Sequence, residues 1–450
     1  MTAPPRSVPF GQALRFWFQL GFISFGGPAG QIALMHTELV ERRRWISERR
    51  FLHALNYCML LPGPEAQQLA TYIGWLMHRS WGGIVAGVLF VLPSFFILVA
   101  LSWLYVRFGH NPWVEGIFYG IKPAVTALVL HAAWRIGTRV LKNRWLWLLA
   151  ALAFVAIAAL QAPFPAIVAV AALVGAVGGR LAPQVFATGG AGPAAEDAAA
   201  RAAAGLAPAV IDDDTPTPPH ARFSRAGLVR VLLAGALLWC GVMALLVAMH
   251  GWHGLLAQMG WFFTKAALLT FGGAYAVLPY VYQGAVEQQQ WLGATQMIDG
   301  LALGETTPGP LIMVVAFVGF VGAWFKPVFG PEALFLSAVV AAGVVTFFTF
   351  LPSFVFILAG GPLVESTHGR LGFTAPLTAI TAAVVGVILN LALFFATHVW
   401  WPQGLDGRFD VASAALCAAA ALALWRARVG VLPLLAACGA AGLVLRALGA

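Results

Sequence analysis

A chain of 450 residues, of which 60% are hydrophobic and only 10% are charged, cannot cover itself with a water-facing surface, because soluble domains are about one quarter charged. The composition therefore excludes a soluble globular protein and indicates that lipid is the main solvent. The net charge of +9 does not indicate a nucleic-acid-binding groove, because 22 of the 26 basic residues are Arg in short loops between apolar segments, which is the pattern of membrane topology.

Apolar segments long enough to cross a bilayer follow one another along the chain. Before the middle of the chain they cover 81–105, 114–134, 145–160 and 164–179. After it they cover 226–249, 332–360, 373–397, 411–425 and 429–447. The intervening segment 181–225 is rich in Ala, Gly, Pro and Asp, which predicts a solvated, disordered linker.

Four short motifs occur twice and in the same order. Three of the pairs are 246 residues apart: Phe25-Gly26-Gly27 with Phe271-Gly272-Gly273, Trp45 with Trp291, and Pro62-Gly63-Pro64 with Pro308-Gly309-Pro310. Leu92-Pro93-Ser94-Phe95 recurs as Leu351-Pro352-Ser353-Phe354 at an offset of 259 residues, after an insertion around 325–335. This shared register indicates two homologous halves.

The basic residues indicate that the two halves are inverted. Segment 38–50 contains five Arg, whereas its counterpart 284–296 contains no Lys or Arg. Segment 135–144 contains four basic residues, and its counterpart 394–403 contains none. Because Lys and Arg accumulate on the cytoplasmic side, equivalent loops are expected on opposite faces.

The same rule favours re-entrant hairpins over full crossings for 10–36 and 51–78. Hairpins keep both Arg-rich loops of the first half on the cytoplasmic side, together with the N-terminus and the linker. We therefore predict an all-α polytopic membrane protein with two inverted-topology halves and broken, re-entrant helices at the FGG and PGP motifs. The predicted parts are an N-terminal repeat (1–180), a disordered cytoplasmic linker (181–225), an extra connecting transmembrane helix (226–249) and a C-terminal inverted repeat (250–450).

The breaks are the predicted binding site for an anion. Glycine permits the reversal of the chain, and proline suits the first turn of the helix that follows. Each new half-helix presents free N–H groups and the positive end of its dipole, and inverted repeats bring such ends together near the membrane midplane. The alternative, that the glycines only allow close helix packing, is disfavoured by the matched motif pairs. The candidate residues are Gly26, Gly27, Pro28, Pro62, Gly63, Pro64, Gly272, Gly273, Pro308, Gly309 and Pro310.

Charged residues within apolar segments are further candidates. A charge at that depth costs about 2.5–3.5 kcal/mol, so Lys122 and Lys265 are candidate anion-binding residues. The alternative, a lysine that extends to the interface, is stronger for Lys265. Glu65 follows the first PGP motif and Glu305 precedes the second. Ionised, either would repel a dianion; protonated, it would not. Both are therefore candidate proton-coupling residues, although Glu65 has the alternative role of capping its half-helix.

Neutral donors also lie beside the breaks, and we expect them to bind oxygen atoms of a substrate. They are Gln31, Gln67, Gln68, Thr306 and Thr307. We interpret His36, His53 and His131 as structural or interfacial. The four cysteines have no CxxC spacing, so the sequence predicts no metal site. It also contains no nucleotide-binding loop, HExxH motif or haem-attachment motif, and we predict neither a cofactor nor enzyme activity.

The segments FGGPAGQIALMH, LLPGPEAQQLATYIG, FGGAYAVLPY and GETTPGP resemble the chromate transporter (CHR) family. The resemblance covers nearly the whole chain except the linker. It implies a bacterial or archaeal inner-membrane protein that expels chromate and confers resistance to it, with sulfate as the other proposed ligand. The chain departs from its own symmetry where Pro28 corresponds to Ala274 and Glu65 to Leu311, so we expect an asymmetric site.

The resulting hypothesis is secondary transport of a divalent tetrahedral anion by alternating access. Uniport, proton symport and exchange stay open. An anion channel of the same fold is one alternative, and a carrier of another substrate is a second, although the small glycine-lined site favours a compact ligand. A chromate reductase is disfavoured because no flavin, haem or iron–sulfur motif is present. The expected partners are chromate or sulfate and the bilayer, without nucleic acid; a homodimer is one alternative for the oligomeric state.

Overall fold

The structure is a computed structural model that describes residues 8–109, 111–186, 209–213, 215–367, 374–404 and 406–448. The regular elements of these residues are helices, and one isolated bridge joins Ile46 to Ile211. The first half contains α1 (Phe10–Ile23), α2 (Gly27–His36), α3 (Glu48–Leu60), α4 (Glu65–Phe108), α5 (Pro112–Val140), α6 (Arg144–Ala158), α7 (Phe164–Leu181) and α8 (Pro183–Phe186). The rest contains α10 (Arg225–His250), α11 (Leu255–Leu269), α12 (Ala274–Tyr282), α13 (Ala294–Thr306), α14 (Val314–Phe325), α15 (Leu334–Thr367), α16 (Thr374–Trp400), α17 (Val411–Trp425) and α18 (Val431–Ala447).

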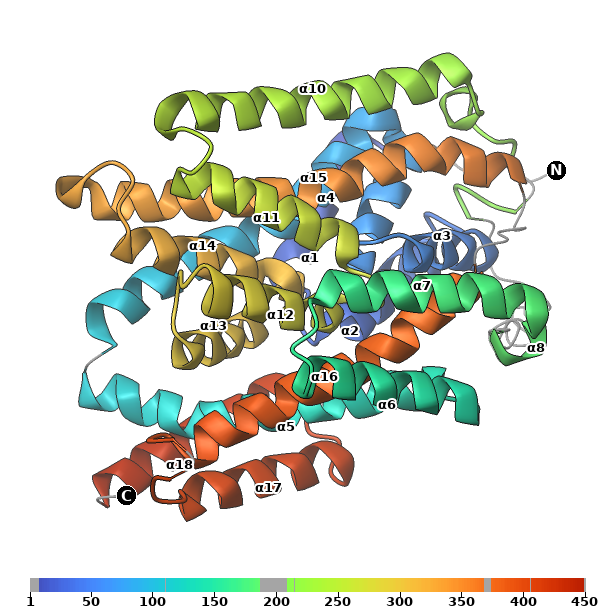
Figure 1. Ribbon diagram of the computed structural model, residues 1–450. Helices are drawn as coiled ribbons and strands as arrows, with labels where there is room; N and C mark the ends of the chain where they lie inside the picture. Colours follow the sequence, from blue (N-terminus) through green and yellow to red (C-terminus); the bar gives the residue numbers. More distant parts are fainter. Residues whose placement is uncertain are drawn as a thin grey trace.

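Each apolar segment predicted to cross the membrane lies largely in one helix, and the segment 81–105 is the part of α4 that follows its break at His78 and Arg79. Among the described residues, six helices are long and apolar enough to cross a bilayer: α4, α5, α7, α10, α15 and α16. The shorter apolar helices α6, α17 and α18 pack beside α16 and α5 (Figure 1). The prediction of an all-helical polytopic membrane protein is confirmed.

The helices break at all four glycine motifs, as predicted. Helices α1, α2 and α3 contain 14, 10 and 13 residues. At about 1.5 Å per residue each rises only about 15–21 Å, which is less than the hydrocarbon thickness of about 30 Å. They are therefore half-crossings. The break glycines have positive φ angles: Gly26, Gly27, Gly63, Gly272, Gly273 and Gly309.

Both hairpins of the first half open on one face of the molecule. His78 Nε2 lies 2.8 Å from the carbonyl oxygen of Val8, which joins the end of the second hairpin to the start of the first. His36 at the end of α2 lies 2.6 Å from the Glu48 carboxylate at the start of α3. Helix α4 loses helical geometry at His78 and Arg79, where the hairpin ends and a full crossing begins. These contacts hold the ends of the two hairpins together on one face, as a re-entrant arrangement requires.

The described parts of the linker pack on this same face, which we call the linker face. Ser47 Oγ donates a 2.6 Å hydrogen bond to the Asp213 carboxylate, and His220 Nε2 lies 3.0 Å from the carbonyl oxygen of Trp75. Of the predicted disordered segment 181–225, residues 187–208 and 214 lie outside the described residues. The other parts have defined structure, because Ile211 and Ala221 bury their side chains against the first half.

The hairpins of the second half open on the opposite face. Helix α10 has 26 residues and rises about 39 Å, which carries the chain from the linker face to the other side. There Lys326 Nζ, after α14, donates a 3.0 Å hydrogen bond to the carbonyl oxygen of Gln290, in the loop between α12 and α13. In Figure 1, α12 and α13 lie toward the left and α3 lies at the right. The two halves are inverted, as predicted from the distribution of Arg.

The internal symmetry extends to single hydrogen bonds. The amide of Trp45 donates to the carbonyl of Leu39 and the amide of Trp291 donates to the carbonyl of Ala285, both at 2.8 Å. In each case the bond joins the Trp to the π-helix just before it, which is η1 (Thr37–Arg42) for Trp45 and η3 (Gln283–Gln288) for Trp291. Hydrogen bonds between the halves are also paired. The Gly63 amide donates to the carbonyl of Thr270, and the Gly309 amide donates to the carbonyl of Ser24, both at 2.8 Å.

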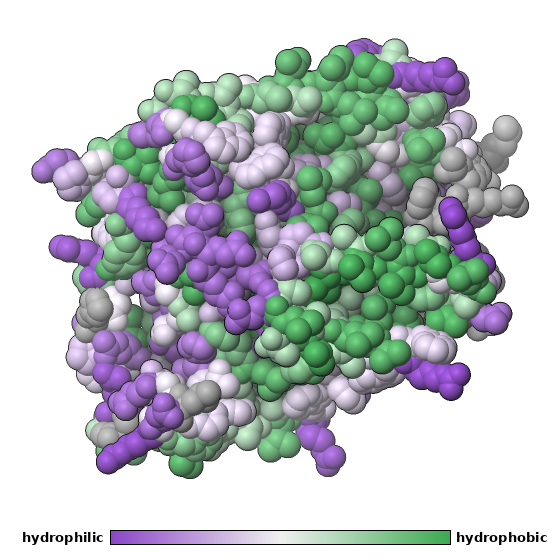
Figure 2. Space-filling view, viewed as in Figure 1, coloured by the Kyte–Doolittle hydropathy of each residue, from purple (hydrophilic) through white to green (hydrophobic). Residues whose placement is uncertain are grey.

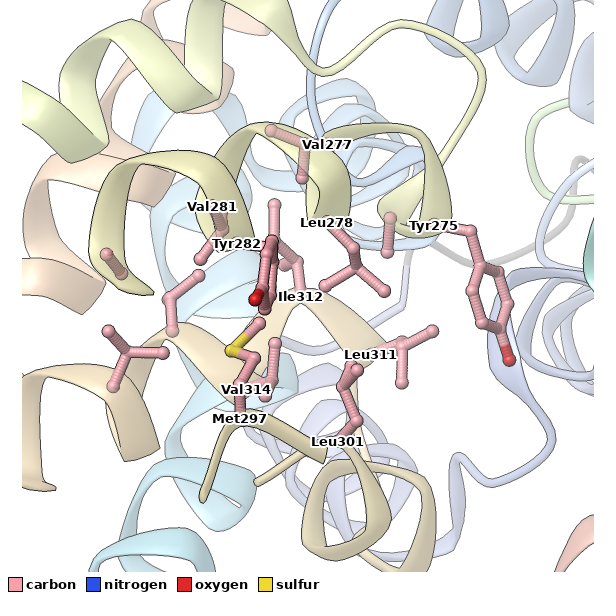
Figure 3. Close-up of a cluster of buried hydrophobic side chains, with 14 of the residues drawn as sticks. Tyr275, Val277, Leu278, Val281, Tyr282, Met297, Leu301, Leu311, Ile312 and Val314 are labelled. Atoms are coloured by element: carbon pink, nitrogen blue, oxygen red, sulfur yellow. The ribbon is translucent and has the colours of Figure 1, made fainter. Parts of the chain in front are cut away.

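Surface and core have the polarity expected in lipid. Hydrophobic residues cover α7 and α10, while hydrophilic residues gather toward the left of the view over the α12–α13 region (Figure 2). In the core, apolar side chains of α12, α13 and the chain after the second PGP motif pack together, among them Leu278, Met297 and Ile312 (Figure 3). Tyr275 stands apart, with its hydroxyl pointing away from this cluster.

Candidate functional site

A cavity of about 440 Å³ lies where the first FGG break meets the linker-face end of α5. Five segments line it, one of them the chain from the end of α17 to the start of α18. The lining residues are Gly26, Gly27, Leu128, His131, Ala132, Arg135, Tyr275, Glu305, Leu424, Trp425, Arg428, Val429, Gly430 and Val431. The cavity therefore lies at a helix break of the first half and is lined by residues of both halves.

The start of α2 contributes backbone groups to this cavity. Gly26 has a φ angle of 87° and is the N-cap of α2, and no side chain caps the first turn. Pro28 lies within that turn and has no N–H of its own to satisfy. The free N–H groups of the turn and the positive end of the helix dipole favour an anion at this position.

Both signs of charge meet in the cavity. Arg135, Arg428 and His131 lie on its wall, and Glu305 faces them from the end of α13. The Tyr275 hydroxyl donates a hydrogen bond to the Glu305 carboxylate. Arg135 also interacts electrostatically with the carboxylates of both Glu305 and Glu65.

Glu65 approaches the same place from the other hairpin. It is the first residue of α4, directly after the first PGP motif. A Cβ atom at Gly273 would lie 3.5 Å from both carboxylate oxygens of Glu65, which places this carboxylate beside the second FGG motif. Gly273 is the N-cap of α12. The structure thus brings together the starts of α2 and α12 and the two predicted proton-coupling residues.

The PGP motifs lie at a different contact, between the halves. A Cβ atom at Gly63 would meet Ser353 Oγ at 2.4 Å, and one at Gly309 would meet Ser94 Cβ at 2.8 Å. Each PGP glycine therefore packs on the serine of the Leu-Pro-Ser-Phe motif of the other half. This contact explains why both motifs recur together, and it locates Pro62, Pro64, Pro308 and Pro310 in structural turns beside the cavity and outside its lining.

The predicted glutamine donors support the breaks. Gln31 Nε2 donates to the carbonyl oxygens of Gly309 at 2.5 Å and Ser24 at 3.2 Å. Gln68 Nε2 donates to the carbonyl oxygen of Pro62 at 2.8 Å, and Gln67 Nε2 to the Thr71 hydroxyl at 3.0 Å. Within the described part of the chain, the Oε1 atoms of all three glutamines are buried without a hydrogen-bond partner. These oxygens can each accept a hydrogen bond from a water molecule.

The predicted threonine donors bond within their own helix turn. Thr306 Oγ1 donates to the carbonyl of Leu303 at 2.8 Å, and Thr307 Oγ1 to the carbonyl of Gly304 at 3.0 Å. Lys265 is exposed on α11, and its Nζ lies 5.7 Å from the centre of the Trp261 ring. Lys265 is not among the residues that line the cavity, and it lies four residues before the end of α11.

Lys122 has a buried partner that the sequence analysis did not identify. Its Nζ lies 3.4 Å from Asp299 Oδ1, and the Asp299 side chain is 4% exposed. The Tyr105 hydroxyl donates a 2.9 Å hydrogen bond to the other carboxylate oxygen. Lys122 precedes Arg135 on α5 by 13 residues, a rise of about 20 Å, so this pair lies toward the face opposite the cavity.

We predict that Lys122→Ala lowers the free energy of unfolding by about 3–5 kcal/mol, because Asp299 is left buried without its cation. Lys265→Ala is the matched control and is expected to change it by about 0.5 kcal/mol or less, since Lys265 is exposed. Unfolding of the purified proteins in detergent measures both. Equal effects of the two substitutions would contradict the importance of the ion pair.

Arg135, Arg428 and Tyr275 line the cavity but were not predicted from the sequence as site residues. Arg135 was used only as evidence for topology, and Arg428 lies in a short loop between apolar segments. His131, interpreted as structural, also lines the cavity. A signal for Arg135 was present: it is the first basic residue after the long apolar part of α5, so it is the cation closest to the membrane interior there.

Comparison with known proteins identifies relatives of this chain. A family model described as "Chromate transporter" matches residues 11–176 and 257–443, and these two matches begin 246 residues apart, as the motifs do. A chromate transport protein of Pseudomonas aeruginosa is 33% identical over 98% of this chain and 92% of its own length. A chromate transport protein of Cupriavidus metallidurans is 30% identical over 88% of this chain and 84% of its own.

No solved structure matches the chain. The family match nevertheless covers both repeats, with the FGG and PGP motifs inside them, and leaves out 177–256, which contains the linker and all of α10. Two inverted halves with breaks at these motifs, and relatives of 30–33% identity over most of the chain, lead to one conclusion. The chain belongs to the chromate transporter family.

Proposed function

We propose that this protein is a secondary active transporter that exports chromate across the inner membrane by alternating access, and that it accepts sulfate as an isosteric tetrahedral dianion. The observation that carries the proposal is the cavity in which the start of α2, Arg135 and Glu305 meet. A helix N-terminus and a guanidinium group both bind tetraoxyanions, the latter through two parallel hydrogen bonds.

The direction of transport follows from the orientation that we propose. The linker face carries the Arg-rich segments 38–50 and 135–144, so it is the cytoplasmic face. The cavity lies toward this face, and toward the other face Lys122, Asp299 and Tyr105 are joined to one another. An inside-negative potential of 100 mV favours the exit of a dianion by about 4.6 kcal/mol.

The two carboxyl groups supply the proposed coupling. A bound dianion beside ionised Glu65 and Glu305 would be repelled, since like charges at short range destabilise each other. Protonation of one group lessens the repulsion and protonation of both removes it, so anion and proton are expected to enter the site together. In this mechanism Arg135 attracts whichever charge is present, carboxylate or substrate, and Tyr275 orients the Glu305 carboxyl group through its hydrogen bond.

The test is uptake of chromate by proteoliposomes that contain the purified protein, with sulfate, molybdate and phosphate as competitors. Saturable uptake that sulfate inhibits supports the proposal. Uptake that rises linearly with concentration and carries current at high rate indicates an anion channel. If chromate is not accumulated and sulfate does not compete with it, the substrate assignment is wrong, whereas the family and the fold are unaffected.

We predict that Glu305→Gln reduces chromate uptake in a pH gradient to the rate seen without the gradient. The amide keeps the size and hydrogen-bonding capacity of the acid but cannot exchange a proton. Glu332→Gln, at an exposed acidic residue before α15, is the control and is expected to retain the full stimulation. A Glu305→Gln variant that is still stimulated by the gradient would exclude Glu305 as the coupling residue and leave Glu65→Gln to be tested.

A further inference from the structure

A second and larger cavity lies on the outside of the helix bundle. This groove has a volume of about 930 Å³ and runs between α4, α10 and α15. Its walls are almost entirely apolar, and its lining includes Val88, Val91, Phe95, Leu238, Phe350 and Val355. The groove is separate from the proposed substrate site, since the two have no lining residue in common.

The groove exists because the first half of α10 is poorly packed. The buried residues of α10 are Met243 and Leu246, both in its second half. Toward this half, Trp239 of α10 attaches the helix to α11, because its Nε1 donates a 2.9 Å hydrogen bond to the Thr264 hydroxyl. In the first half, Gly235 touches Val355 of α15, and the side chains around it leave space. In Figure 1, α10 lies along the upper edge of the molecule.

One end of the groove is basic. Arg222 and Arg230 line it at the linker face, together with Ser224 and His220. No acidic side chain lines the groove, and none of the ion pairs in the described residues includes Arg222 or Arg230. Burial lowers the pKa of His220 below its ordinary value, so the two arginines provide the positive charge at neutral pH.

The spacing of charge and apolar surface matches a phospholipid. Arg230 and Leu238 are eight residues apart on α10, which places the apolar wall about 12 Å deeper than the guanidinium. Basic pockets between transmembrane helices on the cytoplasmic side bind the headgroups of anionic lipids. With the orientation proposed above, the basic end of this groove is at the cytoplasmic leaflet.

We propose that the groove between α4, α10 and α15 binds an anionic phospholipid, with its phosphate on Arg222 and Arg230 and its acyl chains along the apolar wall. The lipid completes the packing of the first half of α10. It also covers the stretch 219–224, the described part of the linker that leads into α10.

Thermal unfolding of the purified protein in uncharged detergent tests the proposal. Phosphatidylglycerol is expected to raise Tm by about 3–6 °C, phosphatidylcholine with the same acyl chains much less, and glycerol phosphate not at all. Arg222→Gln/Arg230→Gln is expected to lose the increment from phosphatidylglycerol. Arg139→Gln, at an exposed arginine on α5 outside the groove, is expected to keep it.

A second pair of variants tests the acyl-chain wall independently of charge. Ala234→Phe fills the groove and is expected to abolish the increment, whereas Ala236→Phe, on the other side of α10, preserves it. Equal increases in Tm from the two phospholipids would mean that the effect comes from the lipid that surrounds any membrane protein. That result would overturn the proposal. An increase in Tm from glycerol phosphate alone would mean that the basic end binds a free phosphate compound and not a phospholipid, which would also overturn the proposal. Neither outcome depends on chromate transport, so the proposed function is tested separately.

Discussion

Replacing Arg135 by glutamine is expected to raise the KM for chromate about 10- to 100-fold in proteoliposomes, with little change in stability. Arg135 lies on the cavity wall, interacts electrostatically with both carboxyl groups, and is only partly buried. Hydrogen bonds to charged groups contribute about 1.5–3 kcal/mol each, which corresponds to this range of affinity. Glutamine keeps much of the length of the side chain but removes its charge.

The control for this prediction is Arg139→Gln, four residues further along α5. Arg139 is exposed and lies outside the cavity, so its replacement is expected to leave the KM unchanged. Arg135→Lys is expected to be intermediate, because an ammonium group keeps the charge but cannot form the bidentate contact. If Arg135→Gln and Arg139→Gln raise the KM equally, the two arginines act only through the overall positive charge of this face. The cavity is then not the binding site.

Gly63→Ala and Gly309→Ala are each expected to destabilise the protein by about 2–5 kcal/mol and to abolish transport. The φ angles of these glycines are 128° and 94°, which are strained for any other residue. A methyl group at Gly63 would also lie 2.4 Å from Ser353 Oγ and 2.6 Å from Gln68 Nε2, and one at Gly309 would lie 2.8 Å from Ser94 Cβ. Overpacking of this kind adds about 1–3 kcal/mol to the strain.

The measurement is the midpoint of thermal unfolding in detergent together with chromate uptake. Gly241→Ala is the matched control, because this glycine lies within α10 and has no atom within 4 Å of the site of a Cβ. Alanine there is expected to be neutral or to stabilise by up to about 1 kcal/mol. A Gly63→Ala protein with wild-type stability would show that the contact between the PGP glycine and Ser353 is not required.

Much of the fold could be predicted from the sequence, including some local details. The 246-residue offset identified two halves, and the same offset relates the π-helices and the main-chain hydrogen bonds that precede Trp45 and Trp291. The Arg content of 38–50 and 284–296 predicted their inversion. These signals were readable because the bilayer imposes them locally. Backbone groups inside lipid must be paired within a helix, and positive charge stays on one side, so length, hydropathy and Arg position carry the topology.

The candidate site could be predicted only in part. Gly26, Gly27, Glu65 and Glu305 were recognised from their places beside the breaks, and the structure brings them into one neighbourhood. Two lysines were singled out by the same argument about buried charge, yet one is paired with Asp299 and the other is exposed on α11. Depth in an apolar segment shows that a charge is costly, but it does not show which partner removes that cost.

Composition, repeats and glycine positions were sufficient to predict that lipid surrounds the protein, that its two halves are inverted and that helices break at four positions, because each of these signals acts over a short stretch of chain. Which breaks line a cavity depends on how the helices pack in three dimensions. This packing places Gly26 and Gly27 of the first FGG motif on a cavity wall with Arg135 of α5, and it turns each PGP glycine onto a serine of the other half. Such contacts join residues that are tens to hundreds of positions apart, and they depend on how inverted halves interlock, which no local pattern encodes.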